Sequence, residues 1–477
     1  MQIHSLGHAS LFVNTEDCKI LIDPVLEDPF FEGLNESCPK REIAKEKLPE
    51  YDFLIISHRH LDHFDLRSLA YLPKNVDVLI PQDYLIEDCL LQLGYSRIYP
   101  LADFAKVRTS STTIMTTSSE IKVPEFGIVI ADSSGVFWNT VDTFFAPKTI
   151  QKVRESFPKI DFLLTTWHIS MEGKYQCNQD ISFPFELYSY LLKLIALIEP
   201  SAIAPGAQGF KYIGSSSWQN QVVFPLTRER FCHDIKSAFP ELENNVFELN
   251  PGDIFDCDSG QYSVLKQASL YAHTLVDDRE TIDFAPVIAG NDLIDYNSDN
   301  HNSELMRHKI EEIVSHQLPQ FITKNSESLF EKHRYWNVIY QLTVIFPDGE
   351  QKWYIDFSES VIKTRKGRNP QANYYSYITA STFYNLIMRQ KDWDYALCNG
   401  EYRTFEKVYL INKSDFQYPQ TINIEDPITL HISSEYIQGN DIYQELLQYK
   451  PDNLNQNITS LKQDSMLRLG DILIKRI

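Results

Sequence analysis

The sequence predicts an α/β fold in the N-terminal half of the chain, followed by a smaller α+β domain. Strand-like and helix-like segments alternate between residues 53 and 100, and a run of β-rich segments follows between residues 110 and 139. A polar stretch that begins near residue 268 separates this part from a β-hairpin pattern after residue 336. A length of 477 residues also favours two or three domains over a single core.

The first predicted elements are a hairpin and a buried strand. Two short β-rich runs between Leu11 and Ile22 flank a polar turn at residues 14–17, and the second run ends at Asp23-Pro24 because proline cannot donate to a sheet. Residues 53–57 form a continuous apolar run, which is typical of a strand covered on both faces. This strand leads directly into a cluster of histidines.

The segments that follow predict alternating helices and strands and then a second sheet. Helical spacing is found at residues 65–72, 84–94 and 187–198, and extended segments at residues 76–80 and 98–100. Later β-rich runs lie at residues 110–117, 126–131, 136–139 and 203–209, with a predicted hairpin turn at residues 132–135. These segments predict a first domain that ends near residue 260.

The second half of the chain predicts a separate domain. Residues 268–329 are polar with helical stretches such as residues 303–317, and two β-rich runs after Trp336 flank the turn Pro347-Asp348-Gly349. The predicted division is residues 1–260 for the first domain, 261–325 for a helical linker and 326–477 for the α+β domain.

Composition limits the partners and the compartment of the protein. Asp and Glu number 65 against 44 Lys and Arg, and this net charge of -21 repels a phosphate backbone, so nucleic acid is not expected as a partner. Seven scattered cysteines never form a Cys-x-x-Cys or Cys-x-His pair, which favours a reducing compartment. The opening residues lack a signal-peptide pattern, and no apolar run is long enough to cross a bilayer. We therefore expect a soluble cytoplasmic protein.

The histidine cluster after the buried strand predicts a metal site. His58, His60, Asp62 and His63 fall within six residues, and a loop at a strand end can direct all four side chains into one cleft. A lone histidine is more often a structural residue, bonded to the backbone. Four ligand-type side chains at this spacing favour metal binding instead.

The cluster and its surroundings resemble the metallo-β-lactamase superfamily over roughly residues 1–260. The segments that carry the resemblance are residues 57–63, Leu6-Gly7-His8-Ala9-Ser10, Leu21-Ile22-Asp23-Pro24 and Asn139-Thr140-Val141-Asp142-Thr143. The resemblance implies an αββα sandwich with two metal ions in one centre.

The same resemblance implies a role for each ligand. His58 and His60 would bind the first metal, Asp62 and His63 the second, and Asp142 would bridge both, with Asp62 and Asp142 as catalytic residues. A bridging carboxylate neutralises two cations that lie a few ångströms apart. His8 and Asp23 are expected to orient the ligands instead of binding metal.

The sequence departs from the family at the third ligand of the first metal. A histidine is usual there, but Thr116-Thr117-Ser118-Ser119-Glu120 contains none, and Glu120 is the nearest candidate. It lies 22 residues before Asp142 (142 minus 120), enough for a hairpin to return to the site. A carboxylate hardens the site and favours iron or manganese over zinc. The last ligand of the second metal is predicted to be His168.

A glutamate at this position resembles the di-iron β-hydroxylases of chloramphenicol-type biosynthesis. Residues 139–143, 161–166 and 205–210 are also similar to CMP-N-acetylneuraminate hydroxylase. Both resemblances imply oxygenation, and the first implies that two irons carry it out on a small-molecule substrate. The second family carries a Rieske iron–sulfur module, for which this sequence has no Cys-x-His pair, so electrons would come from an external reductase or ferredoxin.

Two alternatives stay open at this point. The first is a dinuclear hydrolase with zinc or manganese, in which the metals lower the pKa of a bridging water that attacks an ester, lactone or phosphoester. The second is a binding protein that kept the fold without catalysis.

The C-terminal domain resembles the sterol-carrier-protein-2-like fold. The segments concerned are residues 353–357, 363–367, 377–380, 383–389 and 392–401. Such modules bury an apolar ligand or present substrate to a catalytic neighbour. The basic run Lys363, Arg365, Lys366 and Arg368 either holds an anion or forms a solvated turn.

Overall fold

The structure is a computed structural model of the 477-residue chain. It describes residues 1–177, 179, 183–207, 209–282, 284, 293–369, 371–406, 408, 410–412, 415–417, 419, 424–435, 440–449, 466–469 and 472–475. Among these residues, no helix combines the length and the apolar character that a membrane crossing requires.

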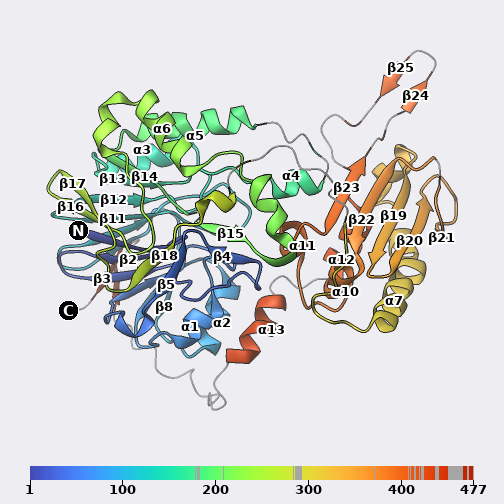
Figure 1. Ribbon diagram of the computed structural model, residues 1–477, viewed down its shortest axis with the longest axis horizontal. Coiled ribbons are helices and arrows are strands. Elements are labelled where there is room, and N and C mark those ends of the chain that lie inside the picture. Colours follow the sequence, from blue (N-terminus) through green and yellow to red (C-terminus); the bar gives the residue numbers. More distant parts are fainter. Residues whose placement is uncertain are drawn as a thin grey trace. The chain divides into compact units, whose positions relative to one another are not determined.

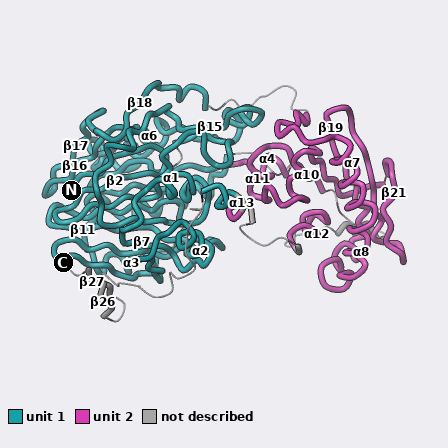
Figure 2. Tube along the Cα trace, turned by 90° about the horizontal axis from the view of Figure 1, so that it is seen from below, with its two compact units in different colours: residues 1–170, 183–286, 445–477 teal, residues 171–182, 287–444 magenta. Residues whose placement is uncertain are grey.

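The chain forms two compact units, which Figure 2 shows in teal and magenta. Unit 1 comprises residues 1–170, 183–286 and 445–477, and unit 2 comprises residues 171–182 and 287–444. These boundaries differ from the predicted ones at residues 260 and 325. The last part of the segment predicted as a helical linker contributes to the core of unit 2, where Ile310, Val314 and Leu318 are buried, whereas residues 261–286 belong to unit 1.

Unit 1 contains a first sheet of eight strands in the order β17-β16-β1-β2-β3-β6-β7-β8. The strands are β1 (Gln2–Gly7), β2 (Ser10–Asn14), β3 (Lys19–Ile22), β6 (Phe53–Ile55), β7 (Asp77–Pro81), β8 (Ile98–Leu101), β16 (Ile254–Asp258) and β17 (Gln261–Leu265). The predicted hairpin is confirmed, since β2 and β3 pair antiparallel. From β3 to β8 the strands run parallel.

The second sheet of unit 1 has the order β14-β13-β12-β11-β10-β9-β27-β26. Its strands are β9 (Lys106–Arg108), β10 (Thr113–Thr116), β11 (Ile128–Asp132), β12 (Gly135–Asn139), β13 (Phe162–Thr165), β14 (Ala202–Pro205), β26 (Met466–Leu469) and β27 (Ile472–Lys475). Two short pairs complete the unit, β4 (Asn35–Ser37) with β15 (Phe210–Tyr212) and β5 (Lys40–Ile43) with β18 (Ala272–Val276).

Alternating side chains place the two sheets face to face. Along β11, Ile128 and Ile130 belong to the core shared with the first sheet, whereas Val129 packs on the opposite face. That outer face is covered by α3 (Pro147–Ser156), α5 (Phe185–Ile198) and α6 (Arg228–Ala238). In Figure 1, α1 (Leu66–Tyr71) and α2 (Tyr84–Gln92) lie on the other side of the unit. The fold is thus the αββα sandwich that the sequence predicted.

Unit 2 is a five-stranded sheet covered by helices. The strands, in the order β21-β20-β19-β22-β23, are β19 (Ile339–Phe346), β20 (Gly349–Asp356), β21 (Thr364–Lys366), β22 (Tyr374–Thr379) and β23 (Tyr402–Glu406). The predicted hairpin is β19 with β20, which pair antiparallel around Pro347 and Asp348. A separate pair joins β24 (Leu410–Asn412) to β25 (Asp415–Gln417).

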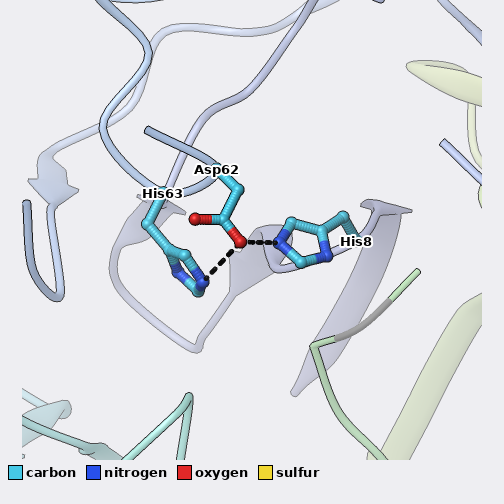
Figure 3. A group of neighbouring side chains, drawn as sticks. All are labelled: His8, Asp62 and His63. Carbon is cyan, nitrogen blue, oxygen red and sulfur yellow. Dashed lines mark hydrogen bonds and ion pairs between the residues drawn. The ribbon is translucent and has the colours of Figure 1, made fainter. Parts of the chain in front are cut away.

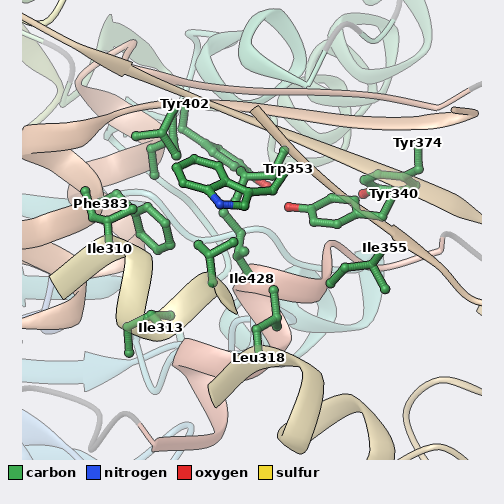
Figure 4. Packing of buried hydrophobic residues seen from close by; sticks show 14 of the residues in the cluster. Ile310, Ile313, Leu318, Tyr340, Trp353, Ile355, Tyr374, Phe383, Tyr402 and Ile428 are labelled. Atoms are coloured by element: carbon green, nitrogen blue, oxygen red, sulfur yellow. The ribbon is translucent and has the colours of Figure 1, made fainter. Parts of the chain in front are cut away.

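Helices bury one face of the unit 2 sheet. The helices of unit 2 are α4 (Glu172–Gln176), α7 (Ser303–Glu312), α8 (Leu318–Lys324), α9 (Glu331–Tyr335), α10 (Ala380–Ile387), α11 (Trp393–Cys398) and α12 (Pro427–Glu435). A short π-helix, η5 (Ile313–Gln317), joins α7 to α8. In Figure 4, Ile310 and Leu318 approach Trp353 and Ile355 of the sheet. The remaining elements are η1 (Lys45–Lys47), η2 (Gly214–Gln221), η3 (Pro240–Asn245), η4 (Arg279–Ile282) and α13 (Asn440–Tyr449).

Candidate metal centre

The loop between β6 and α1 carries the predicted ligands, and buried contacts fix its path. Asp23, at the end of the neighbouring strand β3, accepts hydrogen bonds from the backbone N–H of Ser57 at 2.7 Å and from its Oγ at 2.7 Å. Further along the loop, the Arg59 guanidinium pairs with the buried carboxylate of Asp83 at 2.6 Å. Because the loop is held at both points, its side chains are preorganised before any ligand binds.

His63 lies at the middle of the site. Its Nδ1 lies 2.9 Å from Asp23 Oδ2, so Nδ1 carries the hydrogen and the lone pair of the imidazole is on Nε2. That Nε2 lies 3.2 Å from Asp142 Oδ2 and 3.8 Å from Asp62 Oδ2. Burial lowers the pKa of His63, but the charges of Asp142 and Asp62 outweigh burial and raise it well above 6.5. The negative charges of Asp142 and Asp62 therefore favour a positive charge at the position of His63.

His58 and His60 form the other side of the site. His58 Nε2 and His60 Nδ1 are 2.9 Å apart, and Ser57 Oγ lies 2.9 Å from the other ring nitrogen of His58. Since Ser57 Oγ donates to Asp23, it accepts from His58 Nδ1, and this leaves the His58 lone pair facing His60. Burial, with His63 and His60 nearby, holds the pKa of His58 well below 6.5. A neutral imidazole is the form that binds metal.

Asp142 and His168 follow strands of the second sheet. Asp142 follows β12 in a turn in which Asn139 Oδ1 accepts from the backbone N–H of Val141 at 3.0 Å. Donor atoms of His58, His63 and Asp142 all lie within 4.8 Å of one another, as do those of His8, Asp62 and His63. His168 follows β13; burial lowers its pKa, and the charge of Asp142 opposes that shift. Among the described residues, His168 belongs to neither donor group.

The structure does not bring Glu120 into either donor group. Its carboxylate is 45% exposed and faces Lys148 at 3.9 Å. Glu125 is the buried carboxylate of this stretch, 7% exposed, and it accepts a hydrogen bond from Ser119 Oγ. Burial raises the pKa of Glu125 to about 7, with a further increase from Asp142 and a decrease from His63. Glu125 is therefore a buried carboxyl group that responds to the charges of the site, but among the described residues it belongs to neither donor group, as is the case for Glu120.

Sequence reasoning missed Glu125 for an identifiable reason. Residues 118–125 are mostly polar and contain a proline, and in a short polar and apolar alternation a terminal glutamate is expected on the solvent side, so the pattern does not mark Glu125 as buried. The available signal was the position of Glu125, immediately before the apolar run of β11. The backbone N–H of Phe126 donates to the Ser57 carbonyl at 3.3 Å, and this contact draws the glutamate toward the histidine loop.

His8 orients Asp62, as expected from the sequence. The backbone N–H of Gly209 donates to His8 Nδ1 at 3.1 Å, so the hydrogen of the neutral imidazole is on Nε2, which lies 3.1 Å from Asp62 Oδ2. Figure 3 shows this pair beside His63. His8 has a φ of 49°, and a Cβ on Gly209 would lie 2.9 Å from the His8 backbone nitrogen. Close approach of the two backbones therefore requires glycine at position 209.

Unpaired polar atoms test whether these residues fit a metal. Among the described residues, the buried atoms without a hydrogen bond include Asp142 Oδ1 and His168 Nδ1, and His63 Nε2 faces the carboxylates of Asp142 and Asp62. Leaving a buried polar atom unpaired costs about 1–3 kcal/mol, so the two unpaired atoms indicate a missing partner. Imidazole nitrogens and carboxylate oxygens are the donors that iron, manganese and zinc accept. The site fits divalent metal ions.

Comparisons with known proteins agree with this fold. Residues 2–119 match the family model described as the β-lactamase superfamily domain. Over 173 residues the chain is 27% identical to a Mycobacterium tuberculosis protein named as a Rieske 2Fe-2S iron–sulfur protein, a match that covers 34% of this chain and 33% of that relative. The chain thus spans about one third of the length of this relative.

Two further proteins are similar over parts of the chain. Over 81 residues it is 36% identical to N-acyl-phosphatidylethanolamine-hydrolyzing phospholipase D 1 of Caenorhabditis elegans, which covers 16% of this chain and 21% of that protein. The structure of CmlA, a diiron β-hydroxylase from Streptomyces venezuelae, superposes with a TM-score of 0.32 and 17% identity, over 44% of this chain and 45% of that one. The αββα sandwich and the match over residues 2–119 show that unit 1 has a metallo-β-lactamase fold.

Proposed function

We propose that unit 1 is a dinuclear metal enzyme. His58, His60 and Glu125 would hold the first metal, Asp62, His63 and His168 the second, and Asp142 would lie between them. The proposal keeps the predicted ligands except Glu120, which Glu125 replaces because Glu125 is buried and the charge of Asp142 raises its pKa, whereas Glu120 is exposed. The unpaired atoms of Asp142 and His168, and the carboxylates that face His63 Nε2, support it.

We further propose that the reaction is oxygenation of a small-molecule substrate by two irons. The observation that carries this choice is the burial of Glu125, whose pKa responds to the charges of Asp142 and His63. A third carboxylate in a set of imidazoles favours iron or manganese over zinc. When bound, iron would supply the one-electron chemistry with dioxygen that side chains cannot perform. The similarity to a relative named as a Rieske iron–sulfur protein is consistent with redox chemistry.

The protein's own residues would hold the ligands in their binding forms. Asp23 keeps the hydrogen of His63 on Nδ1, and His8 donates to Asp62, so both ligands present lone pairs to the centre. Asp62 and Asp142 would neutralise the metal charges, since burial raises the pKa of each carboxyl group but His63 lowers it well below 3.8. The electrons would come from an external reductase or ferredoxin.

A dinuclear hydrolase is the second candidate. It is favoured by the 36% identity over 81 residues to a phospholipase whose name describes hydrolysis. In this case zinc or manganese would lower the pKa of a bound water, and the substrate would be an ester, lactone or phosphoester.

Metal content and oxygen dependence distinguish the two candidates. Protein from iron-supplemented cells should contain two irons per chain, with a near-ultraviolet band that dithionite abolishes and air restores. Zinc in both positions, with ester hydrolysis under nitrogen, would instead establish the hydrolase. Glu125→Gln should lose about half of the bound iron, whereas the exposed control Glu120→Gln should keep all of it. Equal iron content in the two variants would refute the ligand role of Glu125.

A further inference from the structure

Unit 2 contains a cavity of its own, with a volume of about 430 Å³. This lies within the range of about 300–1,000 Å³ that is typical of small-molecule sites. The described walls come from β22, β23, α11, the start of α12 and the segment after α4, all of which belong to unit 2. The cavity is therefore independent of the metal centre.

Aromatic rings form much of the cavity wall. Tyr374, Trp393, Tyr402 and Phe405 line it, and the rings of Trp393 and Tyr402 meet edge to face with centroids 5.2 Å apart. Aromatic faces attract cations through the ring quadrupole, most strongly for Trp. The indole Nε1 of Trp393 is buried without a hydrogen-bond partner among the described residues, so it can donate to an oxygen of a bound molecule.

The second feature of the cavity is an unbalanced negative charge at Asp426. This side chain is 5% exposed, and its Oδ1 accepts from Tyr340 at 2.9 Å and from the backbone N–H of Ile428 at 2.8 Å. Its Oδ2 accepts from Tyr402 at 2.7 Å and from Ser376. Burial outweighs these four donors, so the pKa of Asp426 is raised above its ordinary value. Two hydrogen bonds to each oxygen are the arrangement of a carboxylate.

The remaining charged groups of the wall are acidic. Glu406 and Glu425 also line the cavity, and the described lining residues contain no Lys, Arg or His. Burial raises the pKa of Tyr374, and the charges of Asp426 and Glu406 raise it further. Burial and Asp426 act in the same direction on the pKa of Cys177. The potential inside the cavity is therefore negative, which repels anions such as fatty-acid carboxylates.

We propose that this cavity binds an organic ammonium ion, held by the aromatic wall and by the charges of Asp426, Glu406 and Glu425. The ion is either a free small amine or the ammonium headgroup of a lipid. The proposal does not depend on the reaction of unit 1, since each of its observations lies within unit 2.

Matched probes test the charge requirement on the full-length chain. Choline and its neutral isostere 3,3-dimethylbutan-1-ol have the same shape, and decanoate is the anionic probe. We expect choline to bind, as measured by saturation-transfer NMR and calorimetry, with a Kd at least about tenfold lower than that of the isostere. Equal affinity for the isostere, tighter binding of decanoate, or no binding of choline would overturn the proposal.

Variants tie the binding to the cavity. Glu406→Gln and Trp393→Leu should each raise the Kd for choline about fivefold or more, whereas the exposed control Glu327→Gln should not. The melting temperature of each variant verifies that unit 2 remains folded. Unchanged affinity in both cavity variants would overturn the proposal.

Vesicles distinguish the two sources of the ammonium ion. Cosedimentation with phosphatidylcholine vesicles that free choline competes away would assign a lipid headgroup. Choline binding without cosedimentation would assign a free amine. Either result supports the ammonium site.

Discussion

Asp23 Oδ2 lies 2.9 Å from Nδ1 of His63, and both side chains are fully excluded from solvent. The same carboxylate accepts both the backbone N–H and the hydroxyl of Ser57. Because β3 and β6 are parallel neighbours, the end of one strand fixes the loop that leaves the other. One buried aspartate thus sets the direction of the ring nitrogen that faces Asp142.

Asp23→Asn should weaken metal binding without unfolding unit 1. The amide keeps the volume of the side chain but has one oxygen in place of two. Its NH2 group therefore faces the N–H of either Ser57 or His63, and that N–H loses its hydrogen-bond acceptor. Loss of such an orienting bond typically costs about 10–100-fold in metal affinity. Competition with a chelator measures the affinity, and the exposed control Asp258→Asn should be unaffected. Unchanged affinity in the Asp23 variant would contradict the orienting role.

Glu125→His should shift the metal preference of the centre. Replacing the carboxylate by an imidazole softens the donor set and restores the ligand type that is usual in this superfamily. We expect the zinc-to-iron ratio of protein from mixed-metal medium to rise about threefold or more, as measured by elemental analysis. Glu120→His, in which the new imidazole lies at an exposed position, serves as the matched control. A ratio that changes equally in both variants would argue against Glu125.

Gly209→Ala should disturb His8. The added Cβ would lie 2.9 Å from the backbone nitrogen of His8 and 3.0 Å from its Cα, so the two backbones must separate. Such overpacking costs about 1–3 kcal/mol of the free energy of unfolding, and we expect weaker metal binding because His8 holds Asp62. Thermal unfolding and metal titration measure both effects. Gly173→Ala, where a Cβ meets nothing within 4 Å, should be tolerated.

His333 should make the stability of unit 2 depend on pH. The side chain is 1% exposed, and burial lowers its pKa to about 4 from 6.5. The unfolded chain therefore binds the proton first as the pH falls, so the stabilisation is complete above 6.5 and is lost progressively toward 4. A shift of this size corresponds to about 3 kcal/mol.

The comparison with His333→Gln isolates this contribution. The free energy of unfolding of the native chain minus that of the variant should decrease as the pH falls from 6.5 to 4, as measured by urea titration at each pH. The exposed His308→Gln serves as control, since its difference should stay constant. A constant difference for His333 as well would contradict the buried neutral histidine.

The sequence was most informative where burial and chemistry follow a local pattern. The apolar run that becomes β6 and the spacing of His58, His60 and His63 predicted the fold, which is confirmed, and a group of histidines that the structure brings together, because both depend on neighbouring residues. The buried position 125 could not be distinguished from the exposed position 120 in this way. The choice depends on the contact between Phe126 and Ser57, which joins residues far apart in the sequence.

The boundaries of the two units were not predicted correctly, again because they depend on contacts between residues far apart in the sequence. Residues 303–324 have the polar surface of a linker, but their apolar positions complete a core with strands that come later in the chain. A hydrophobic stripe on a helix shows that a partner exists without identifying it.

The pairing of β27 with β9 joins positions 472 and 106, a separation of 366 residues (472 minus 106). During synthesis β9 therefore lacks this neighbour until all of unit 2 has left the ribosome. In the interval its backbone amides and carbonyls on that side form an open edge, which is a template for association with another nascent chain. A fragment of unit 1 that ends at residue 286 lacks β27, so the edge of β9 would stay unpaired in it.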